Sequence, residues 1–245
     1  MDSFEGDRDG AVATVLADVL SDPLGYTSPS IYETARLVSD APWLVNHEQR
    51  IRFLLVSQHS DGSWGGQDSY RLVPTLSATE ALLAVATRPV ARDDRDAAVL
   101  PAARKGLAVL FRWLGGDNRV SVPDTIAVEI IVPALVAGIN DHLARLATHP
   151  VSGLDQWASA RLGLPKGTDG ALLPRLRNRV REGGSLPLKM HHSLEVIGDA
   201  ARGATFVSPA DGAVGASPAA TAAWLGGRPD SGDAHESVRY LRTAQ

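Results

Sequence analysis

The side chains with the clearest capacity for chemistry in this sequence are two adjacent histidines, His191 and His192, in the block His-His-Ser-Leu-Glu. Neighbouring residues on a helix point about 100° apart, so the two rings cannot both face one cavity. A helical zinc site places its histidines four residues apart rather than side by side. We therefore predict no zinc site here. Taken without its surroundings, a single helical histidine is an ordinary core or surface side chain.

Arginine occupies every second position from residue 175 to residue 181, just before the histidine block. Guanidinium groups suit bidentate binding of a diphosphate, which makes Arg175 and Arg177 candidate diphosphate ligands. The alternative is a solvated helix face or loop. The spacing spreads the four side chains around a helix, so at most one or two of them converge on a ligand.

The composition excludes several classes of function. The chain has 245 residues, of which 44% are hydrophobic, enough for one large domain or two small ones. Its net charge of −4 gives no basic surface for nucleic acid or an anionic membrane. The absence of cysteine excludes disulfides and thiolate metal sites. The polar N-terminus does not resemble a signal peptide, and no apolar run reaches the roughly 18 residues of a membrane span. We expect a soluble, cytoplasmic protein.

The elements that must position these residues are predicted to be helices. Apolar residues recur at helical spacing at Ile51, Leu54 and Leu55, and again from Leu76 to Ala86 on one face. Ile131, Leu135 and Ile139 repeat the pattern, with Pro133 expected to kink that helix or to start a new one. No segment alternates like a strand. The sequence predicts an all-α chain of about eight to ten helices, separated by Gly- and Pro-rich loops.

The segment from Gln58 to Gly66 predicts a structural turn between two helices. Its Gln58, Gly62 and Trp64 stand in the order Gln-His-Ser-Asp-Gly-Ser-Trp-Gly-Gly. A glutamine amide can tie the end of one helix to the start of the next, and glycine allows positive φ. Trp64 is expected to stack on Gln58 and bury its ring. The alternative is an ordinary helix-hairpin turn around a core tryptophan. We assign the other tryptophans to the core rather than to cation–π contacts with a ligand.

A weak internal repeat supports a ring of helices. Asp61-Gly-Ser-Trp-Gly precedes a small-residue helix that starts near Pro74, and Asp211-Gly-Ala-Val-Gly precedes another that starts at Pro218. Helix–turn–helix units that cannot bury their faces alone stack into solenoids or rings. An α/α-barrel is the architecture we predict.

Five blocks in fixed order extend these patterns to a known family. They are Ser28-Pro-Ser-Ile-Tyr-Glu, the Gln58–Trp64 turn, Thr125-Ile-Ala-Val-Glu-Ile-Ile-Val-Pro, His191-His-Ser-Leu-Glu and Ser217-Pro-Ala-Ala-Thr-Ala-Ala-Trp. Together they resemble the N-terminal half of bacterial class II diterpene cyclases, the copalyl diphosphate synthases. The turn resembles the QW motif of terpene-cyclase and prenyltransferase α-barrels. The resemblance implies protonation-initiated cyclisation of geranylgeranyl diphosphate to copalyl diphosphate, of the ent type.

The family's architecture implies a division of the chain into two parts. Residues 1–40 would hold the first helix of the β domain and its link, and residues 41–245 would form the γ-like α-barrel. The family's acid is a D-x-D-D motif in the β domain, and this sequence contains none; Asp93-Asp-Arg-Asp96 has the wrong order and reads as a solvated loop. We expect a separated portion of a cyclase that is inactive alone. The missing β-domain half is its expected partner, and an exposed apolar face in its absence predicts dimerisation or poor solubility.

The resemblance also assigns roles to single residues. His192 matches the histidine that holds a water, which removes the final proton from the cyclised cation. Family members bind Mg²⁺ and the diphosphate with an acidic patch of this domain, for which Asp117, Asp124 and Glu129 are the available acids; Asp124 and Glu129 are the ligands we predict. Glu129 could instead stabilise a helix N-terminus.

Two other functions remain open from the residues alone. The chain could be a non-catalytic α-barrel that binds an isoprenoid diphosphate or a partner protein. A squalene-cyclase-like or prenyltransferase-like enzyme is disfavoured, because the former needs several QW repeats and the missing acid, and the latter needs a cysteine ligand for zinc.

Overall fold

The computed structural model describes residues 10, 12–17, 20, 29–88, 97–115, 120–227 and 234–244. Over this part of the chain the structure is helical, with two isolated β-bridges in the segment 210–217 and no strand. Its elements are α2 (Ile31–Asp40), α3 (His47–Val56), η1 (Asp68–Arg71), α4 (Leu72–Ala86), α5 (Val99–Leu114), α6 (Val128–Leu146), η3 (Asp155–Trp157), α7 (Leu172–Arg181), η4 (Leu188–Ala201), α8 (Pro218–Leu225) and α9 (Ala234–Thr243). The prediction of an all-α chain is confirmed.

The chain divides into two compact units, Met1–Ser30 and Ile31–Gln245. In the first unit, residues 12–17 are helical. Its apolar side chains are solvent-exposed at helical spacing: Val12, Val15, Leu16 and Leu20. In the second unit, α2 packs against α4 and α8. The assignment of residues 1–40 to a different domain from residues 41–245 stays a prediction.

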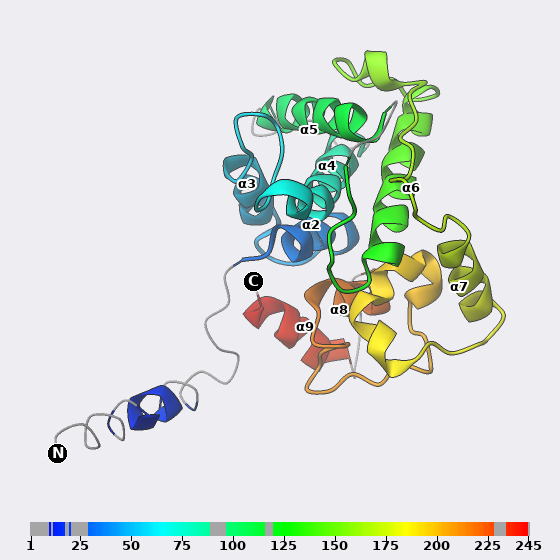
Figure 1. Cartoon of the computed structure of the whole chain (residues 1–245). Helices are drawn as coiled ribbons and strands as arrows, with labels where there is room; N and C mark the ends of the chain where they lie inside the picture. The colour runs from blue at the N-terminus through cyan, green and yellow to red at the C-terminus, as the bar shows by residue number, and fades with distance from the viewer. Residues whose placement is uncertain are drawn as a thin grey trace. The chain divides into compact units, whose positions relative to one another are not determined.

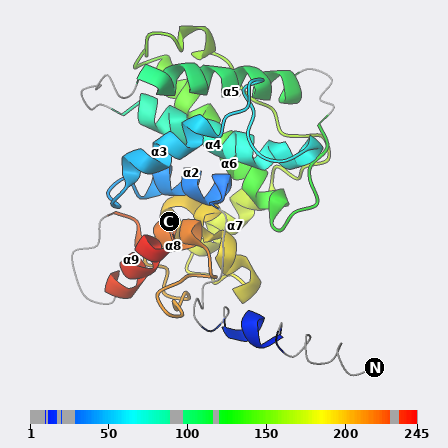
Figure 2. The same ribbon diagram turned by 90° about the vertical axis from the view of Figure 1, so that its left-hand side faces the viewer.

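Helix α4 lies at the centre of the second unit. It is apolar around most of its circumference, so the sequence-predicted face from Leu76 to Ala86 is buried together with the rest of the helix. It packs against α2, α5 and α6, and Figures 1 and 2 both show it between α5 and α2. Because α4 is surrounded, its polar side chains meet other parts of the protein rather than solvent: Glu80 finds its partners on α2 and α6, while the Thr79 hydroxyl is buried without one.

Helix α6 continues through Pro133 as one element, so the expected start of a new helix at that residue is wrong. Buried apolar residues on both sides of the proline, among them Ile131 and Leu135, belong to the main core. Packing along the whole helix outweighs the loss of one backbone hydrogen bond.

The turn after α3 is braced differently from the sequence expectation. The Gln58 amide donates to Gly62 O at 3.1 Å and to Ala102 O at 3.0 Å, so it ties the turn to α5 rather than to the start of α4. The indole of Trp64 is fully buried, as expected, and donates to Leu54 O at 2.7 Å. Its stacking on Gln58 stays a prediction. Gly62 has φ 93°, and a Cβ there would lie 2.9 Å from Lys105 O on α5. The close approach of α5 at Gly62 brings the Ala102 carbonyl within reach of the Gln58 amide.

The second copy of the repeat forms a corresponding turn. The backbone N–H of Val214 donates to the hydroxyl of Thr221 at 2.9 Å, as that of Trp64 does to Thr75 at 3.0 Å. Gly212 has φ 82°, and a Cβ there would lie 2.4 Å from Glu236 O on α9. Each turn therefore rests on the backbone of a later helix. The structure supports the internal repeat.

A buried cluster of charged and polar side chains joins α2, α4 and α6. The Glu80 carboxylate of α4 accepts hydrogen bonds from Arg36 and from Ser39 of α2. Its other oxygen lies 3.0 Å from His142 Nε2 of α6. Arg36 Nε also donates to Ser77 Oγ at 3.1 Å. Burial alone would raise the pKa of Glu80, but Arg36 and His142 hold that pKa well below its usual range. The carboxylate is thus ionised inside the core.

We predict that Glu80→Gln destabilises the protein by about 3–5 kcal/mol, because the variant leaves Arg36 buried without its ionic partner. Urea denaturation at neutral pH measures this as a lower midpoint with an unchanged slope.

The matched control is Asp169→Asn, which removes the ionic partner of Arg175 from a solvent-exposed pair. Such pairs contribute about 0–1 kcal/mol, so the control should stay close to the parent chain. A Glu80→Gln variant as stable as the control would contradict the prediction.

Candidate functional site

The His-His-Ser-Leu-Glu block lies in η4, which is a 3₁₀ helix rather than the α-helix expected from the sequence. The element is kinked, because Ser193 (φ −125°, ψ 32°) and Gly198 (φ 69°, ψ −141°) both depart from helical geometry. His191 is buried, with Nε2 3.3 Å from Leu186 O and its ring 5.7 Å from that of Phe206. The Nε2 of His192 is also buried but has no hydrogen-bond partner. The 100° spacing of an α-helix is not the spacing of this element, yet the rings of His191 and His192 do have different surroundings.

Glu195, three residues after His192, is held by α2. The Tyr32 hydroxyl donates a short hydrogen bond to Glu195 Oε1, while Oε2 is buried without a partner. Burial raises the pKa of Glu195 to about 8, although the Tyr32 hydrogen bond opposes the shift. A pKa in this range favours the protonated carboxyl group at neutral pH. Burial and the neighbouring Glu195 carboxyl raise the pKa of Tyr32 well above its usual value.

The next residue of α2, Glu33, connects this helix to the start of α8. Its carboxylate lies 3.1 Å from Ser217 Oγ and accepts from the N–H of Ala219 at 2.7 Å. Ser217 itself caps α8 by accepting from Ala220 N at 3.1 Å. Burial raises the pKa of Glu33, and these hydrogen bonds and the nearby Arg36 and His192 oppose the rise. We name the meeting point of α2, η4 and α8, formed by Tyr32, Glu33, His192, Glu195 and Ser217, the η4 junction.

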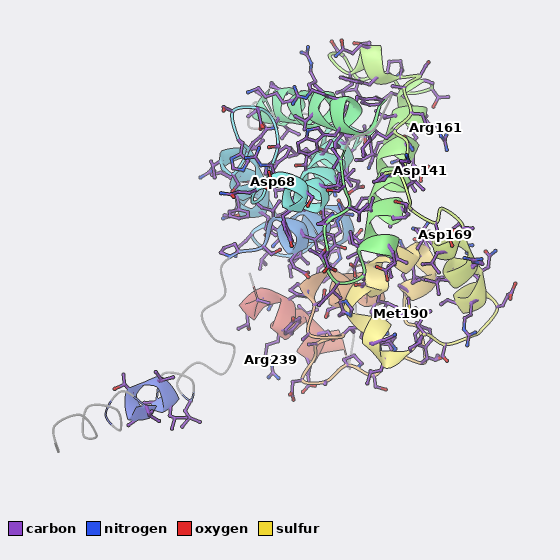
Figure 3. All side chains as sticks on the ribbon, in the orientation of Figure 1. Asp68, Asp141, Arg161, Asp169, Met190 and Arg239 are labelled. Atoms are coloured by element: carbon purple, nitrogen blue, oxygen red, sulfur yellow. The ribbon has the colours of Figure 1, made fainter. Side chains whose placement is uncertain are left out.

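The arginines of α7 make separate local contacts. Arg177 Nε donates to Val196 O of η4 at 2.9 Å, and burial lowers the pKa of this guanidinium. Arg175 forms an exposed ion pair with Asp169 at 2.7 Å. In Figure 3, Asp169 lies beside α7 and Met190 marks η4. Arg179 and Arg181 bond to Ser185 O and Asn178 Oδ1. Of the predicted diphosphate ligands, only Arg177 contacts the element that carries His192.

The predicted metal ligands Asp124 and Glu129 are both exposed, near the start of α6. Within the described ranges, no three His, Asp or Glu side chains group closely enough to hold a metal ion. Asp117 and the run Asp93–Asp96 lie outside the described residues. The Mg²⁺ site stays a prediction, limited to these two carboxylates.

An open surface hollow of about 650 Å³ lies elsewhere, lined by residues of η1, the end of α5 and the segment after it: Gln67, Asp68, Ser69, Arg71, Trp113, Val120 and Ser121. Asp68 marks it in Figure 3, apart from Met190 of η4. Tryptophan rings pack against other side chains of the core. Trp157, for example, stacks on Phe111 with ring centroids 4.8 Å apart. Among the described helices, none has the length and apolar character needed to cross a membrane.

Sequence reasoning missed Tyr32, Glu33 and Glu195 as members of one site. Tyr32 and Glu195 are 163 residues apart in the chain, and no local pattern links them. One signal in the sequence could have identified Glu195. It is the last residue of the histidine block and is followed by apolar Val196 and Ile197, a pattern that favours burial of its carboxyl group.

Comparison with known proteins gives a consistent result. No family model matches the sequence. An ent-copalyl diphosphate synthase of Streptomyces sp. (strain KO-3988) is 42% identical over 235 residues, covering 96% of this chain and 43% of that protein. A copalyl diphosphate synthase of Streptomyces cyslabdanicus is 44% identical over 222 residues, covering 89% and 41%.

A solved structure, the ent-copalyl diphosphate synthase from Streptomyces platensis, superposes with a TM-score of 0.84 at 42% identity, covering 97% of this chain and 46% of the other. The predicted fold class is thereby confirmed. The chain spans less than half the length of the relatives that it matches.

The protonation state of Glu195 yields a pH prediction. With a folded pKa of about 8 against an ordinary value near 4.5, the folded chain holds a proton that the unfolded chain releases between these limits. The contribution of Glu195 to stability therefore falls as pH rises from 5 to 8. In Glu195→Gln, which mimics the neutral acid, we expect the loss of stability over this range to be smaller by at least about 1.4 kcal/mol, the equivalent of one pKa unit.

Urea denaturation of both proteins at pH 5 and pH 8 measures the difference. Glu182→Gln is the control, since Glu182 is exposed just after α7 and should keep the parent pH dependence. Equal pH dependence in the Glu195→Gln variant and the parent would show that Glu195 is ionised in the folded state.

Proposed function

Because this chain belongs to the bacterial class II diterpene cyclases of the copalyl diphosphate synthase type, we propose that it supplies one helical domain of an enzyme that cyclises geranylgeranyl diphosphate. The observation that carries the proposal is 42% identity to an ent-copalyl diphosphate synthase along 96% of this chain. In the proposed reaction a proton adds to the terminal alkene, the rings close, and the final tertiary cation loses a proton. The product is a bicyclic isomer that keeps its diphosphate.

We propose that the chain alone does not start this reaction. Protonating an alkene needs a neutral, strongly polarised carboxyl group in a dry pocket. The sequence has no D-x-D-D motif, and its relatives extend over more than twice the matched length. The acid would lie in the part of the enzyme that this sequence does not contain. The exposed stripe of Val12, Val15, Leu16 and Leu20 is an apolar surface for that part to cover.

His192 is the residue we propose for the last step. Its buried, unpartnered Nε2 can hold a water molecule, and such a water is a sufficient base because a tertiary carbocation is a very strong acid. The ring acts by placing the water next to the proton that leaves. Glu195 stays protonated nearby, so it adds no negative charge that would trap the cation.

Mg²⁺ and the diphosphate are proposed to bind at the exposed carboxylates of Asp124 and Glu129. One or two carboxylates suit Mg²⁺, because this ion keeps several waters and takes further oxygens from a bound phosphate. Bound there, the ion would neutralise the charge of the diphosphate. Arg177, and Arg175 after release of its exposed pair with Asp169, would add guanidinium groups.

The test is to co-express this chain with the downstream part of the Streptomyces sp. (strain KO-3988) synthase, add geranylgeranyl diphosphate, and analyse the products by mass spectrometry. We expect a bicyclic diphosphate from the pair and none from this chain alone. Product from the chain alone would refute its inactivity. Calorimetric binding of the substrate with no product from the pair would instead favour a non-catalytic binding protein.

In the same pair, we expect His192→Ala to divert product towards a hydroxylated diphosphate, because water then adds to a cation that is no longer deprotonated in place. Total turnover should change by less than about tenfold, since protonation occurs elsewhere. His149→Ala, at an exposed histidine after α6, is the control. An unchanged product from His192→Ala removes that residue from the mechanism.

A further inference from the structure

We propose that Gly215 is a positioning residue, which sets the place of His192 by backbone contact; the inference rests on the proposed role of His192. Gly215 has φ 58°, and a Cβ there would lie 2.4 Å from His192 N and 2.5 Å from His192 Cα. It would also lie 2.7 Å from His191 C. All three atoms belong to backbone, so no side-chain rotation could relieve the clash. The missing side chain lets the second turn lie directly on the peptide between the two histidines.

The turn is anchored and has little freedom to retreat from η4. Ala210 and Ala213 exchange backbone hydrogen bonds at 2.9 and 2.8 Å. Val214 N is held by Thr221 Oγ1, and Ser217 caps α8. On its far side, Gly212 leaves no room for a Cβ against Glu236 of α9. A methyl group at position 215 therefore displaces η4 rather than the turn.

Within η4, the displacement would concentrate at His192. Tyr32 of α2 holds Glu195, and Arg177 of α7 holds the carbonyl of Val196. Ser193, between these contacts and the histidines, already departs from helical geometry. The segment 191–193 is thus the part of η4 that can move while residues 195–196 stay fixed.

The corresponding glycine of the first turn has a different neighbour. A Cβ at Gly65 would lie 2.8 Å from Cγ of Pro74 and 3.3 Å from Tyr70 O, both in the segment that directly follows the first turn. The first turn thus packs at this position on its own continuation, and the second on the peptide of His192. Contact with a histidine backbone is therefore no general requirement of the repeat.

The experiment compares Gly215→Ala with Gly203→Ala. Gly203 has φ 57°, matching Gly215, but a Cβ there meets nothing within 4 Å. Both variants place an alanine at nearly the same positive φ, and only the first adds a clash with His192. In the co-expressed pair we expect Gly215→Ala to lower the ratio of deprotonated to hydroxylated product about tenfold or more, as for a catalytic group displaced by a fraction of an ångström. Gly203→Ala should keep the parent ratio.

A second readout uses the 245-residue chain alone. In ¹H–¹⁵N NMR spectra, Gly215→Ala should shift the amide signal of His192, and Gly203→Ala should leave it in place. If Gly215→Ala does not fold, Tyr32→Phe provides the test from the other side of η4, with Tyr70→Phe at an exposed tyrosine as its control. Loss of the Tyr32 bond should also lower the product ratio.

The outcomes separate this inference from the proposed function. If His192→Ala changes the product but Gly215→Ala, or Tyr32→Phe in its place, matches its control, the positioning role is refuted and the function stands. If His192→Ala also leaves the product unchanged, the role of His192 is refuted, and the positioning role of Gly215 is refuted with it. An unshifted His192 amide in folded Gly215→Ala refutes the positioning role whatever the co-expressed pair produces.

Discussion

The packing of α2, α4 and α6 depends on the ion pair and hydrogen bonds of the ionised Glu80 carboxylate inside the core. A buried carboxylate is tolerated only when its partners are close and fixed, which here are Arg36 and Ser39 of α2 and His142 of α6. Arg36 and Tyr32 are four residues apart on α2 and so lie on the same face of that helix. The ion pair that orients Arg36 therefore also directs Tyr32 towards Glu195. The core charge and the η4 junction are linked through one helix.

Glu80 of α4 and Glu195 of η4 illustrate how the surroundings of a carboxyl group determine its charge. Glu80 meets a guanidinium and an imidazole and stays charged. Glu195 meets a phenol and has an unpartnered oxygen, so burial leaves it neutral. Near a carbocation, a neutral carboxyl group can donate a hydrogen bond to water without competing as an anion. The junction combines that neutrality with a histidine whose Nε2 is available.

Sequence patterns were sufficient where the structure depends on local chemistry. Helical periodicity identified the helices, and the repeated Asp-Gly segments identified two turns that share a threonine contact. Sequence patterns were insufficient where contacts with backbone far away in the chain determine the local geometry. The amide of Gln58 bonds to Ala102, and the α5 backbone that attracts it lies 44 residues away. η4 contacts α2, α7 and the second turn, all of which lie outside the histidine block, and the block itself gave no sign of the 3₁₀ geometry.

The same distinction applies to the candidate site. His192 was predicted from a family resemblance, and its buried Nε2 suits the role that the resemblance implied. Tyr32 and Glu33 belong to the first of the five blocks that carry the family resemblance. Nothing in that block indicated that Tyr32 would contact η4 or that Glu33 would contact the start of α8. Arg175 and Arg177 were grouped by spacing alone, yet one pairs with an exposed aspartate and the other with a backbone carbonyl. Residues two apart on a helix point in nearly opposite directions, so the alternating arginines do not converge on one ligand.

The dependence of each turn on a later helix bears on the order in which the molecule can form during synthesis. Chains fold as they leave the ribosome, amino end first. The first turn is complete once α5 has emerged, because Gly62 needs only Lys105 beside it. The second turn lies against Glu236 of α9, which follows Lys105 by 131 residues in the chain (236 − 105). The neighbourhood of His192 consequently closes later in synthesis than the first turn.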